Sequence, residues 1–465
     1  MSESENLWGA RVAAAKSAEN FAEFNNSFAF DRRLFTAEIR VGISYCDALF
    51  HAGVLTRLEG ERIKNGLQTI LKRSAYDKNY FDEQPSEDVY SFVETRLVQL
   101  VGEAGRKLQI GRSRNDQSAT ALRLWLKDEI ENTSNLARKL QKTLIESAEK
   151  HREAVLPAYA HLQRAQPILW AHWCLAYFEM LARDRERLDE VWRRAGVLPL
   201  GSATLAGTSF EIDREELAAN LGFEGVSLNS LDAVSDRDFA VEFLAASALI
   251  MVHLSRLAED LILYASSEFQ FIEFSETVST TSNLSAQKKI SGALEFVRGK
   301  AGRIFGHHLA LLTTLKGLPT GCSNDLQEDR EAVFDTVDTL KNCLETVTVI
   351  LKIVRVKEEK TREAASNGYQ NATELVDYLI QKDVPILNAD ETVGKIVHYA
   401  ASKKRELNEL SLAEMQNFSA QIETDVFDAL SLERTLSSKA QIGGTAPERV
   451  FEALDAARGA LEMEE

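Results

Sequence analysis

Residues 121–150, ALRLWLKDEIENTSNLARKLQKTLIESAEK, decide the fold class of this chain. Their apolar side chains recur in steps of three and four, and charged side chains fill the opposite face. This spacing predicts a long amphipathic helix. Asn115 and Asp116 stand ahead of it, and short polar side chains of this kind cap the free N–H groups at a helix start. The apolar positions are Leu122, Leu126, Ile130, Ala137, Leu140, Leu144 and Ala148.

Four more segments are helical by the same criterion. The segment 239–266 is apolar almost all round its middle, so it must be buried among other helices. Pro157 and Pro167 predict a loop after the first helix, and a Ser- and Thr-rich stretch predicts another over 273–289. Strand signals are nearly absent. We therefore predict an all-α protein with an elongated central bundle, whose other long helices cover 170–194, 239–266, 292–316 and 327–364.

Helix length divides the chain into three predicted domains. Residues 1–105 form an N-terminal domain of shorter helices, residues 106–364 the long-helix bundle, and residues 365–465 a C-terminal helical domain. The central helices are too long and too apolar for the surface of a monomer. They predict packing against other subunits.

Composition and charge exclude several classes of function. The chain has 54 Lys and Arg against 71 Asp and Glu, a net charge of −17, and non-specific nucleic-acid binding needs a basic face. The most apolar run, 243–252, is too short to span a membrane, and residues 1–16 do not resemble a signal peptide. Scattered cysteines fit a reducing compartment, so we expect a cytoplasmic protein without a nucleic-acid or membrane partner. The cysteines are Cys46, Cys174, Cys322 and Cys343.

The sequence contains no familiar metal or nucleotide motif. The eight His residues form no HExxH pattern, and neither a Walker A sequence nor a Rossmann glycine fingerprint is present. We expect no metal and no cofactor.

Two polar clusters lie near the first long helix. Residues 111–117, GRSRNDQ, place two arginines and an Asn at a helix start, which suits a carboxylate or phosphate. Residues 159–164, YAHLQR, contain His161, whose imidazole can exchange a proton near neutral pH. The alternatives are a helix cap with surface arginines and a structural histidine.

Two further clusters follow later in the chain. Residues 279–289 combine many hydroxyls with two lysines, which suits an anion site with an activated serine. Gln327 and Arg330 are three residues apart on one predicted helix face and could grip an amino-acid end group. The alternatives are a flexible surface loop and a capped helix with solvated charges.

Nine motifs, taken in order, resemble the argininosuccinate lyases of the fumarase/aspartase superfamily. The resemblance covers nearly the whole chain. It implies a mostly helical homotetramer with a twenty-helix core and active sites built from three subunits. The motifs are LWGAR at 7–11, FNNSFAFDRRL at 24–34, GRSRNDQ at 111–117, AHLQRAQP at 160–167, LPLGSATLAGTSF at 198–210, NSLDAVSDRDF at 229–239, KGLP at 316–319, DLQED at 325–329 and GGTAPERV at 443–450.

The resemblance also implies a reaction, the reversible elimination of fumarate from argininosuccinate to leave arginine, as in arginine biosynthesis. A base must remove a weakly acidic C–H proton while the adjacent carboxylate gains charge, and the leaving nitrogen needs a proton. By family match Ser282 is the base and Lys288 the cation. His161 and Glu295 form the proton-handling or orienting couple. Ser113, Arg114 and Asn115 would hold carboxylates, and Ser27, Gln327 and Arg330 the arginine part.

The chain departs from the family pattern at positions that face the ligand. Around the mobile loop the family pattern resembles GSSxMPxKxNP. Here Ser282 and Lys288 remain, but Thr281 replaces Gly and Ile290 replaces Asn. Isoleucine cannot donate the hydrogen bond of an asparagine, and threonine restricts the backbone. Further departures are Ala160 for Thr, Tyr90 for His, Gln109-Ile110 for His-Thr or His-Ser, Cys322-Ser323 for Tyr-Asn, and Arg330 for Lys.

Three interpretations remain open from the sequence. The first is an argininosuccinate lyase with a divergent site. The second is a superfamily lyase that acts on another N-substituted aspartate, with Cys322 and Arg330 setting the leaving group. The third is a catalytically impaired tetramer with a structural or regulatory role, because each lost hydrogen bond to the transition state can cost roughly 100- to 1000-fold in rate.

Overall fold

The computed structural model describes residues 24–83, 86–274, 280–282, 285–290 and 292–463. The chain divides into two compact units. The first comprises Met1–Glu131, Asp189–Leu244 and His307–Thr336, and the second comprises Asn132–Leu188, Ala245–Gly306 and Val337–Glu465. The three-domain division with boundaries at residues 105 and 364 stays a prediction.

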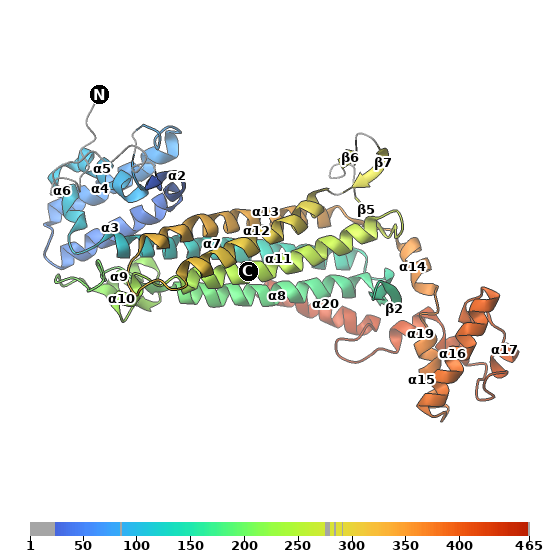
Figure 1. Ribbon diagram of the computed structural model, residues 1–465. Helices are drawn as coiled ribbons and strands as arrows, with labels where there is room; N and C mark the ends of the chain where they lie inside the picture. The colour runs from blue at the N-terminus through green and yellow to red at the C-terminus, as the bar shows by residue number, and fades with distance from the viewer. Residues whose placement is uncertain (1–23, 84–85, 275–279, 283–284, 291, 464–465) are drawn as a thin grey trace. The chain divides into compact units, whose positions relative to one another are not determined.

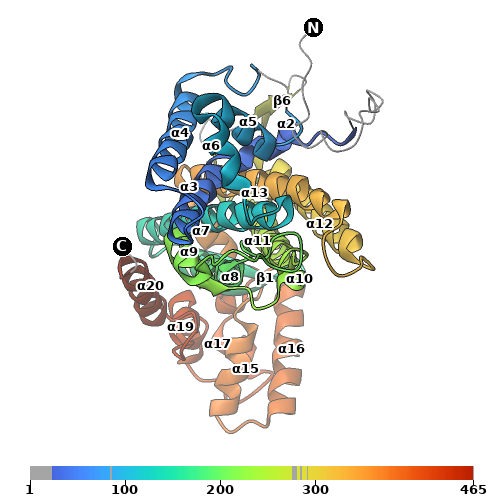
Figure 2. The same ribbon diagram turned by 90° about the vertical axis from the view of Figure 1, so that its left-hand side faces the viewer.

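Five long helices pass through both units, and their segments lie side by side within each unit (Figures 1 and 2). The all-α prediction with five long central helices is confirmed. The helices are α7 (Arg114–Lys150), α8 (Trp170–Ala195), α11 (Asp238–Ala265), α12 (Gly292–Leu315) and α13 (Asp329–Lys352).

Polar and aromatic contacts of buried side chains hold these helices together. In the second unit, Trp173 Nε1 and the Tyr177 hydroxyl of α8 both donate to Asp260 Oδ2 of α11, at 2.9 and 2.7 Å. In the first unit, the rings of Trp125 on α7 and Phe334 on α13 meet edge to face, with centroids 4.7 Å apart. Such aromatic pairs contribute about 0.5–1.5 kcal/mol beyond their buried area.

Helix α11 is long and apolar enough to cross a membrane by length and composition alone. Half of its most apolar window, 50%, is buried inside the structure. This burial matches the sequence expectation that α11 is a core helix among other helices.

The remaining elements of the first unit are shorter than the five long helices. An aromatic cluster joins α2, α3 and α5, with the ring centroids of Phe28 and Phe92 5.1 Å apart. The elements are α2 (Phe28–Asp31), η2 (Arg32–Leu34), α3 (Phe35–His51), α4 (Arg57–Tyr76), α5 (Val89–Val101), α6 (Glu103–Arg106), η3 (Lys107–Gln109), β3 (Val197–Leu198), α9 (Arg214–Leu221), β4 (Gly225–Val226), α10 (Ser230–Ala233) and η4 (Asn324–Glu328).

The second unit adds three strand pairs and a C-terminal group of helices. The C-terminal helices bury their own apolar cluster, which includes Leu375, Ile396 and Met415. The elements are β1 (Val155–Ala160), β2 (Gln163–Leu169), β5 (Ile272–Glu273), β6 (Thr280–Ser282), β7 (Ser285–Ile290), β8 (Arg355–Val356), α14 (Glu358–Ser366), α15 (Ala372–Gln381), α16 (Ile386–Lys403), η5 (Leu407–Glu409), α17 (Leu412–Gln416), α18 (Val426–Ala429), α19 (Leu432–Ser437) and α20 (Pro447–Glu462).

Two sequence expectations about local structure are wrong. The predicted loop with Pro157 and Pro167 is an antiparallel hairpin, β1–β2, in which these two prolines lie opposite each other. Each strand of a two-stranded sheet is an edge strand, so a proline, which has no N–H, can lie with its nitrogen on the unpaired side without breaking a ladder bond. In the described part of the predicted Ser- and Thr-rich loop, residues 280–282 and 285–289 lie in the paired strands β6 and β7. The parts of this predicted loop at 275–279 and 283–284 lie outside the described residues.

The predicted helix over 327–364 is also wrong, because it ends at Lys352. Beyond that residue the chain forms β8, in which Val356 lies opposite Ile272 of β5. The chain then turns into α14. β-Branched residues pack well in such extended pairs, and this tertiary pairing overrides the helical spacing.

Candidate active site

Ser113, Arg114 and Asn115 lie at the start of α7, and hydrogen bonds to the Asp116 carboxylate hold this helix start in place. The Asp116 carboxylate accepts from the Ser113 N–H at 2.9 Å, as the third residue of a helix does in a capping box. The Ser113 hydroxyl accepts from the Asn115 N–H at 3.4 Å, and the Asn115 side chain donates to the Thr204 carbonyl at 3.0 Å. The helix begins at Arg114, one residue before the predicted start.

Asp116 also holds the glycine-punctuated loop that follows α8. Its Oδ2 accepts from the N–H groups of Gly201, at 3.0 Å, and Ala203, at 2.8 Å. Gly201 has φ of +96°, and a Cβ there would lie 2.8 Å from Arg214 Cδ, so only glycine fits. Burial raises the pKa of Asp116 to about 6, and the three backbone N–H groups oppose this rise.

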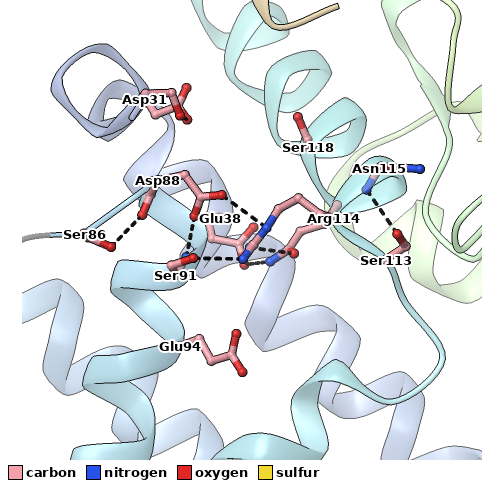
Figure 3. Close-up of polar contacts among 12 residues, drawn as sticks. Asp31, Glu38, Ser86, Asp88, Ser91, Glu94, Ser113, Arg114, Asn115 and Ser118 are labelled. Atoms are coloured by element: carbon pink, nitrogen blue, oxygen red, sulfur yellow. Dashed lines mark hydrogen bonds and ion pairs between the residues drawn. The ribbon is translucent and has the colours of Figure 1, made fainter. Parts of the chain in front are cut away.

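The guanidinium of Arg114 is held from three sides (Figure 3). Its Nε lies 3.3 Å from Asp88 Oδ2, its Nη2 donates to the Ser91 hydroxyl at 3.1 Å, and its Nη1 donates to Gln117 Oε1 at 3.2 Å. Asp88 is the N-cap of α5, and its carboxylate also accepts from the Ser91 N–H. The Arg114 side chain keeps 30% of its surface exposed, so the remaining N–H groups can reach a ligand.

A buried polar network of Gln117, Glu38 and Arg112 supports the Arg114 side chain. The Gln117 amide donates from Nε2 to Glu38 Oε1 at 2.5 Å, which leaves its oxygen to accept from Arg114. Arg112 Nη1 lies 3.7 Å from the same Glu38 oxygen, and both side chains are almost fully buried. Burial raises the pKa of Glu38, and Arg112 and Gln117 oppose the shift. Arginine donates only, so the orientation of the Gln117 amide is fixed by chemistry.

Arg330 forms a second buried centre with Asp31. Its Nη1 lies 2.6 and 2.7 Å from the two Asp31 oxygens, and its Nη2 donates to the Ser118 hydroxyl at 2.6 Å. The Ser27 hydroxyl donates to the same carboxylate at 2.5 Å. Burial raises the pKa of Asp31, while Arg330 and Ser27 oppose the rise.

The ring of Tyr90 joins the two arginine centres. The Cζ atom of Arg114 lies 4.9 Å from its centroid and that of Arg330 lies 5.9 Å from it. The structure therefore brings together Ser27, Arg114 and Arg330 of the predicted binding residues. The prediction placed Gln327 and Arg330 on one helix face. In the structure Gln327 is exposed in η4, whereas Arg330 is buried in the first turn of α13.

The predicted catalytic residues, in contrast to these binding residues, belong to the second unit. His161 is exposed at the turn of the β1–β2 hairpin, where His161 and Leu162 have left-handed φ values of 54° and 60°. A cavity of about 550 Å³ lies beside this hairpin and is lined by Tyr159, Arg164 and Phe271, among others. Glu295 is exposed in the first turn of α12.

Ser282 and Lys288 lie on the β6–β7 hairpin, and their side chains fall outside the described residues. The backbone pairs Ser282 with Ser285 and Thr281 with Lys289, with an irregularity between Thr281 and Ser282. Within the described part of the chain, no three His, Cys, Asp or Glu side chains are grouped to hold a metal ion.

Sequence reasoning gave no site role to Asp31, Asp88, Ser91, Gln117 and Glu38. Asp31 and Arg330 are 299 residues apart, so no local pattern could pair them. A weak signal did exist for Asp31, because a carboxylate among Phe28, Phe30 and Phe35 needs a cationic partner when it is buried, but the adjacent Arg32 and Arg33 are the partners that the sequence suggests.

Comparisons with known proteins agree with this fold. A family model described as "Lyase" matches residues 13–306, and one described as "Argininosuccinate lyase C-terminal" matches residues 369–437. The chain is 48% identical over 456 residues to the argininosuccinate lyase of Pelotomaculum thermopropionicum, and this match covers 98% of each chain.

Solved structures share the same architecture. A variant of EDDS lyase with bound fumarate has a TM-score of 0.84 and 26% identity, and the match covers 97% of this chain and 92% of that one. The 3-carboxy-cis,cis-muconate lactonizing enzyme from Pseudomonas putida has a TM-score of 0.74 at 20% identity, covering 95% and 99% of the two chains. The second likeness concerns the fold alone.

Proposed function

The chain belongs to the argininosuccinate lyase family of carbon–nitrogen lyases, and we propose a role for each of its site residues in the release of fumarate from argininosuccinate. The observation that carries the proposal is the 48% identity over nearly the full length. The restrained, partly exposed Arg114 supports it, because the reaction needs a fixed cation for a carboxylate.

Ser113, Arg114 and Asn115 bind carboxylates of the succinyl part. They stand at the start of α7, where backbone N–H groups and the helix dipole favour an anion. Arg114 supplies the charge through the N–H groups that its protein partners leave available. Asp116 keeps this helix start against the loop at 201–203.

Ser27, Gln327 and Arg330 hold the arginine part. Gln327 supplies an exposed amide, which can both donate and accept. Arg330 acts through N–H groups that are not committed to Asp31 and Ser118.

The elimination uses residues of the second unit. Ser282 removes the proton from the carbon next to the C–N bond, and Lys288 stabilises the carboxylate that gains charge. The C–N bond then breaks, and its electron pair leaves with the guanidino nitrogen. His161, oriented by Glu295, handles the proton that this nitrogen needs.

We propose a cytoplasmic homotetramer with a twenty-helix core and shared active sites. Phe305, Leu309 and Leu312 follow helical spacing on α12 and are 42%, 66% and 43% exposed in the single chain. His161, Glu295 and Gln327 are exposed as well, as expected of residues that complete a site on another subunit.

A second candidate function is elimination from another N-substituted aspartate. The high structural similarity to EDDS lyase supports it, and so does the pairing of Arg330 with Asp31, which restricts the cation near the leaving group. The two candidates share the same fumarate-forming step and differ in the amine released.

A direct turnover assay tests the proposal. Purified protein is mixed with argininosuccinate, fumarate is followed by ultraviolet absorbance, and arginine is quantified. We expect stoichiometric fumarate and arginine. Release only from other aspartyl adducts selects the second candidate, and no release from any adduct by an intact tetramer selects a catalytically impaired protein.

The Ser282→Ala variant tests the assigned base, with Ser285→Ala on the facing strand as its matched control. Removing the base should abolish turnover, while the control should keep most of it. Undiminished turnover in Ser282→Ala removes Ser282 from its role.

A further inference from the structure

We propose that Tyr90 is a positioning residue, whose ring fixes the guanidinium of Arg114 for the substrate carboxylate beside the buried Arg330–Asp31 pair. This inference rests on the proposed function, because it assumes that Arg114 binds a carboxylate. It adds a role for a residue at which the chain departs from its family pattern.

The placement of Tyr90 suits this role. Tyr90 lies in the first turn of α5, between Asp88 and Ser91, and both of these residues contact the Arg114 guanidinium. Only 1% of Tyr90 is exposed. A guanidinium stacks on an aromatic face, and the 4.9 Å between Arg114 Cζ and the ring centroid is within the range of such contacts.

The four contacts of Arg114 complement each other. Asp88, Ser91 and Gln117 take one N–H from each of the three guanidinium nitrogens. These contacts act at the edges of the planar group, whereas the Tyr90 ring acts on the guanidinium as a whole. Without the ring the long side chain would regain rotamers, and its remaining N–H groups would no longer point to one place.

The presence of Arg330 favours a neutral side chain at position 90. Its guanidinium is 5.9 Å from the same ring centroid, and its Nη1 and Nη2 atoms are held by Asp31 and Ser118. The side chain of Arg330 is 7% exposed, against 30% for Arg114. Arg114 is thus the more accessible of the two cations, and a further positive charge between them would repel both.

The state of the Tyr90 hydroxyl agrees with this placement. It makes no hydrogen bond of normal geometry to the described residues. Burial raises the pKa of the Tyr90 phenol, and the nearby Arg330 and Ser118 oppose this rise. The phenol therefore stays neutral. The hydroxyl adds little to the contact with Arg114, so the ring itself carries the effect.

The test compares Tyr90→Phe, which keeps the ring, with Tyr90→Leu, which removes it. Tyr90→Leu should raise KM for argininosuccinate by roughly 3- to 30-fold, the range of a partly desolvated cation–π contact. Tyr90→Phe should stay within about twofold of the wild type. Should Tyr90→Leu not fold, Tyr90→Met takes its place with the same expectation.

Tyr80 provides a matched control for mere loss of packing. It is 2% exposed, and the Cζ atoms of Arg73 and Arg96 lie 5.3 and 5.0 Å from its ring centroid. Tyr80→Leu should lower the melting temperature as Tyr90→Leu does and leave KM unchanged. An equal rise of KM in both variants overturns the positioning role.

A double-mutant cycle with Arg114→Lys tests the route of the effect. Lysine keeps the charge but loses the planar fork, so Tyr90→Leu should have little further effect on KM in that background. Fully additive effects overturn the proposal. If the wild-type protein releases no fumarate, the proposed function has failed, and the same variants are compared by calorimetric titration with fumarate. Unweakened fumarate binding by Tyr90→Leu, or no binding by the wild type, then overturns the inference as well.

Discussion

At the scale of single residues, the ion pair between Asp31 and Arg330 is a strong constraint in the first unit. Both side chains are almost fully buried, and the carboxylate also accepts from Ser27. Taking two charges out of water is costly, and their attraction repays that cost only when every partner is present. The pair therefore contributes little net stability as a unit but is very sensitive to the loss of one member.

The first prediction concerns Asp31→Asn, which removes the closest counter-ion of the buried Arg330 guanidinium and leaves only Asp329, at 3.9 Å from Nε. The free energy of unfolding should fall by about 3–5 kcal/mol, the range for a buried pair that loses one partner. Urea unfolding followed by tryptophan fluorescence measures this loss. Glu61→Gln is the control, because its partner Arg57 lies at 3.0 Å in an exposed pair one helical turn away. A similar loss in both variants would contradict the argument from burial.

The second prediction concerns the pH dependence that Asp116 imposes. Its folded-state pKa of about 6 lies above the unfolded-state value, so between about pH 4 and 6 the folded chain holds a proton that the unfolded chain has released. The resulting stabilisation is fully present below the unfolded-state pKa and is lost as the pH rises through about 6. A shift of roughly two units corresponds to about 3 kcal/mol.

Asp116→Asn removes this titration. Asparagine cannot accept all three N–H bonds, so the variant should be less stable than the wild type at low pH. Its deficit should then shrink by up to about 3 kcal/mol as the pH rises from 4 to 7. Unfolding curves at several pH values measure the difference, with Asp82→Asn at an exposed carboxylate as control. Parallel profiles for wild type and Asp116→Asn would show that Asp116 does not titrate in this range.

At the scale of elements, the long helices could be predicted from sequence and the hairpins could not. Helices α7, α8, α11 and α12 each begin and end within two residues of their expected limits, because periodicity persists over many turns. The turn of β1–β2 contains His161 and Leu162 with positive φ, where Asn-Gly is the usual signal. Without that signal, the two prolines indicated a loop.

The candidate site shows the same limit. The helix-start cluster at 113–115 could be found from sequence, because its residues are consecutive. The pairing of Arg330 with Asp31 and the stacking of Arg114 on Tyr90 depend on the packing of α2, α5, α7 and α13. These contacts join distant parts of the sequence, so neither composition nor spacing predicts them.

The third prediction concerns the strained turn of β1–β2. Leu162 has a φ of 60° and is 73% exposed, so Leu162→Gly removes a conformational cost of about 1–2 kcal/mol and little packing. After the entropy cost of glycine, the variant should be as stable as the wild type or more stable by up to about 1 kcal/mol. Ala160→Gly, in the extended strand, should instead lose about 0.5–1 kcal/mol. Thermal unfolding compares them, and a larger loss for Leu162→Gly would contradict the argument.

At the scale of the whole molecule, the net charge opposes the association of subunits, whereas exposed apolar surface favours it. Each chain carries a net charge of −17, so four copies repel one another. The apolar side chains that the single chain exposes on α12 must supply the opposing free energy, at roughly 25 cal/mol per Å² buried. The proposed tetramer therefore depends on a few large side chains on the long helices.

The last prediction follows from this balance. Leu309→Glu places a carboxylate in the centre of the Phe305–Leu309–Leu312 stripe, which removes apolar contact and adds to the repulsion. Light scattering should show a tetramer for the wild type and smaller species for the variant, and dissociation should be strongest at low ionic strength, where repulsion is least screened. Turnover should fall together with the tetramer if subunits share the active sites as proposed. Leu387→Glu, at an 80% exposed position on α16, is the control and should remain tetrameric. An unchanged mass for Leu309→Glu would exclude this stripe from the interface, and full turnover by its dissociated form would show that one subunit holds a complete site.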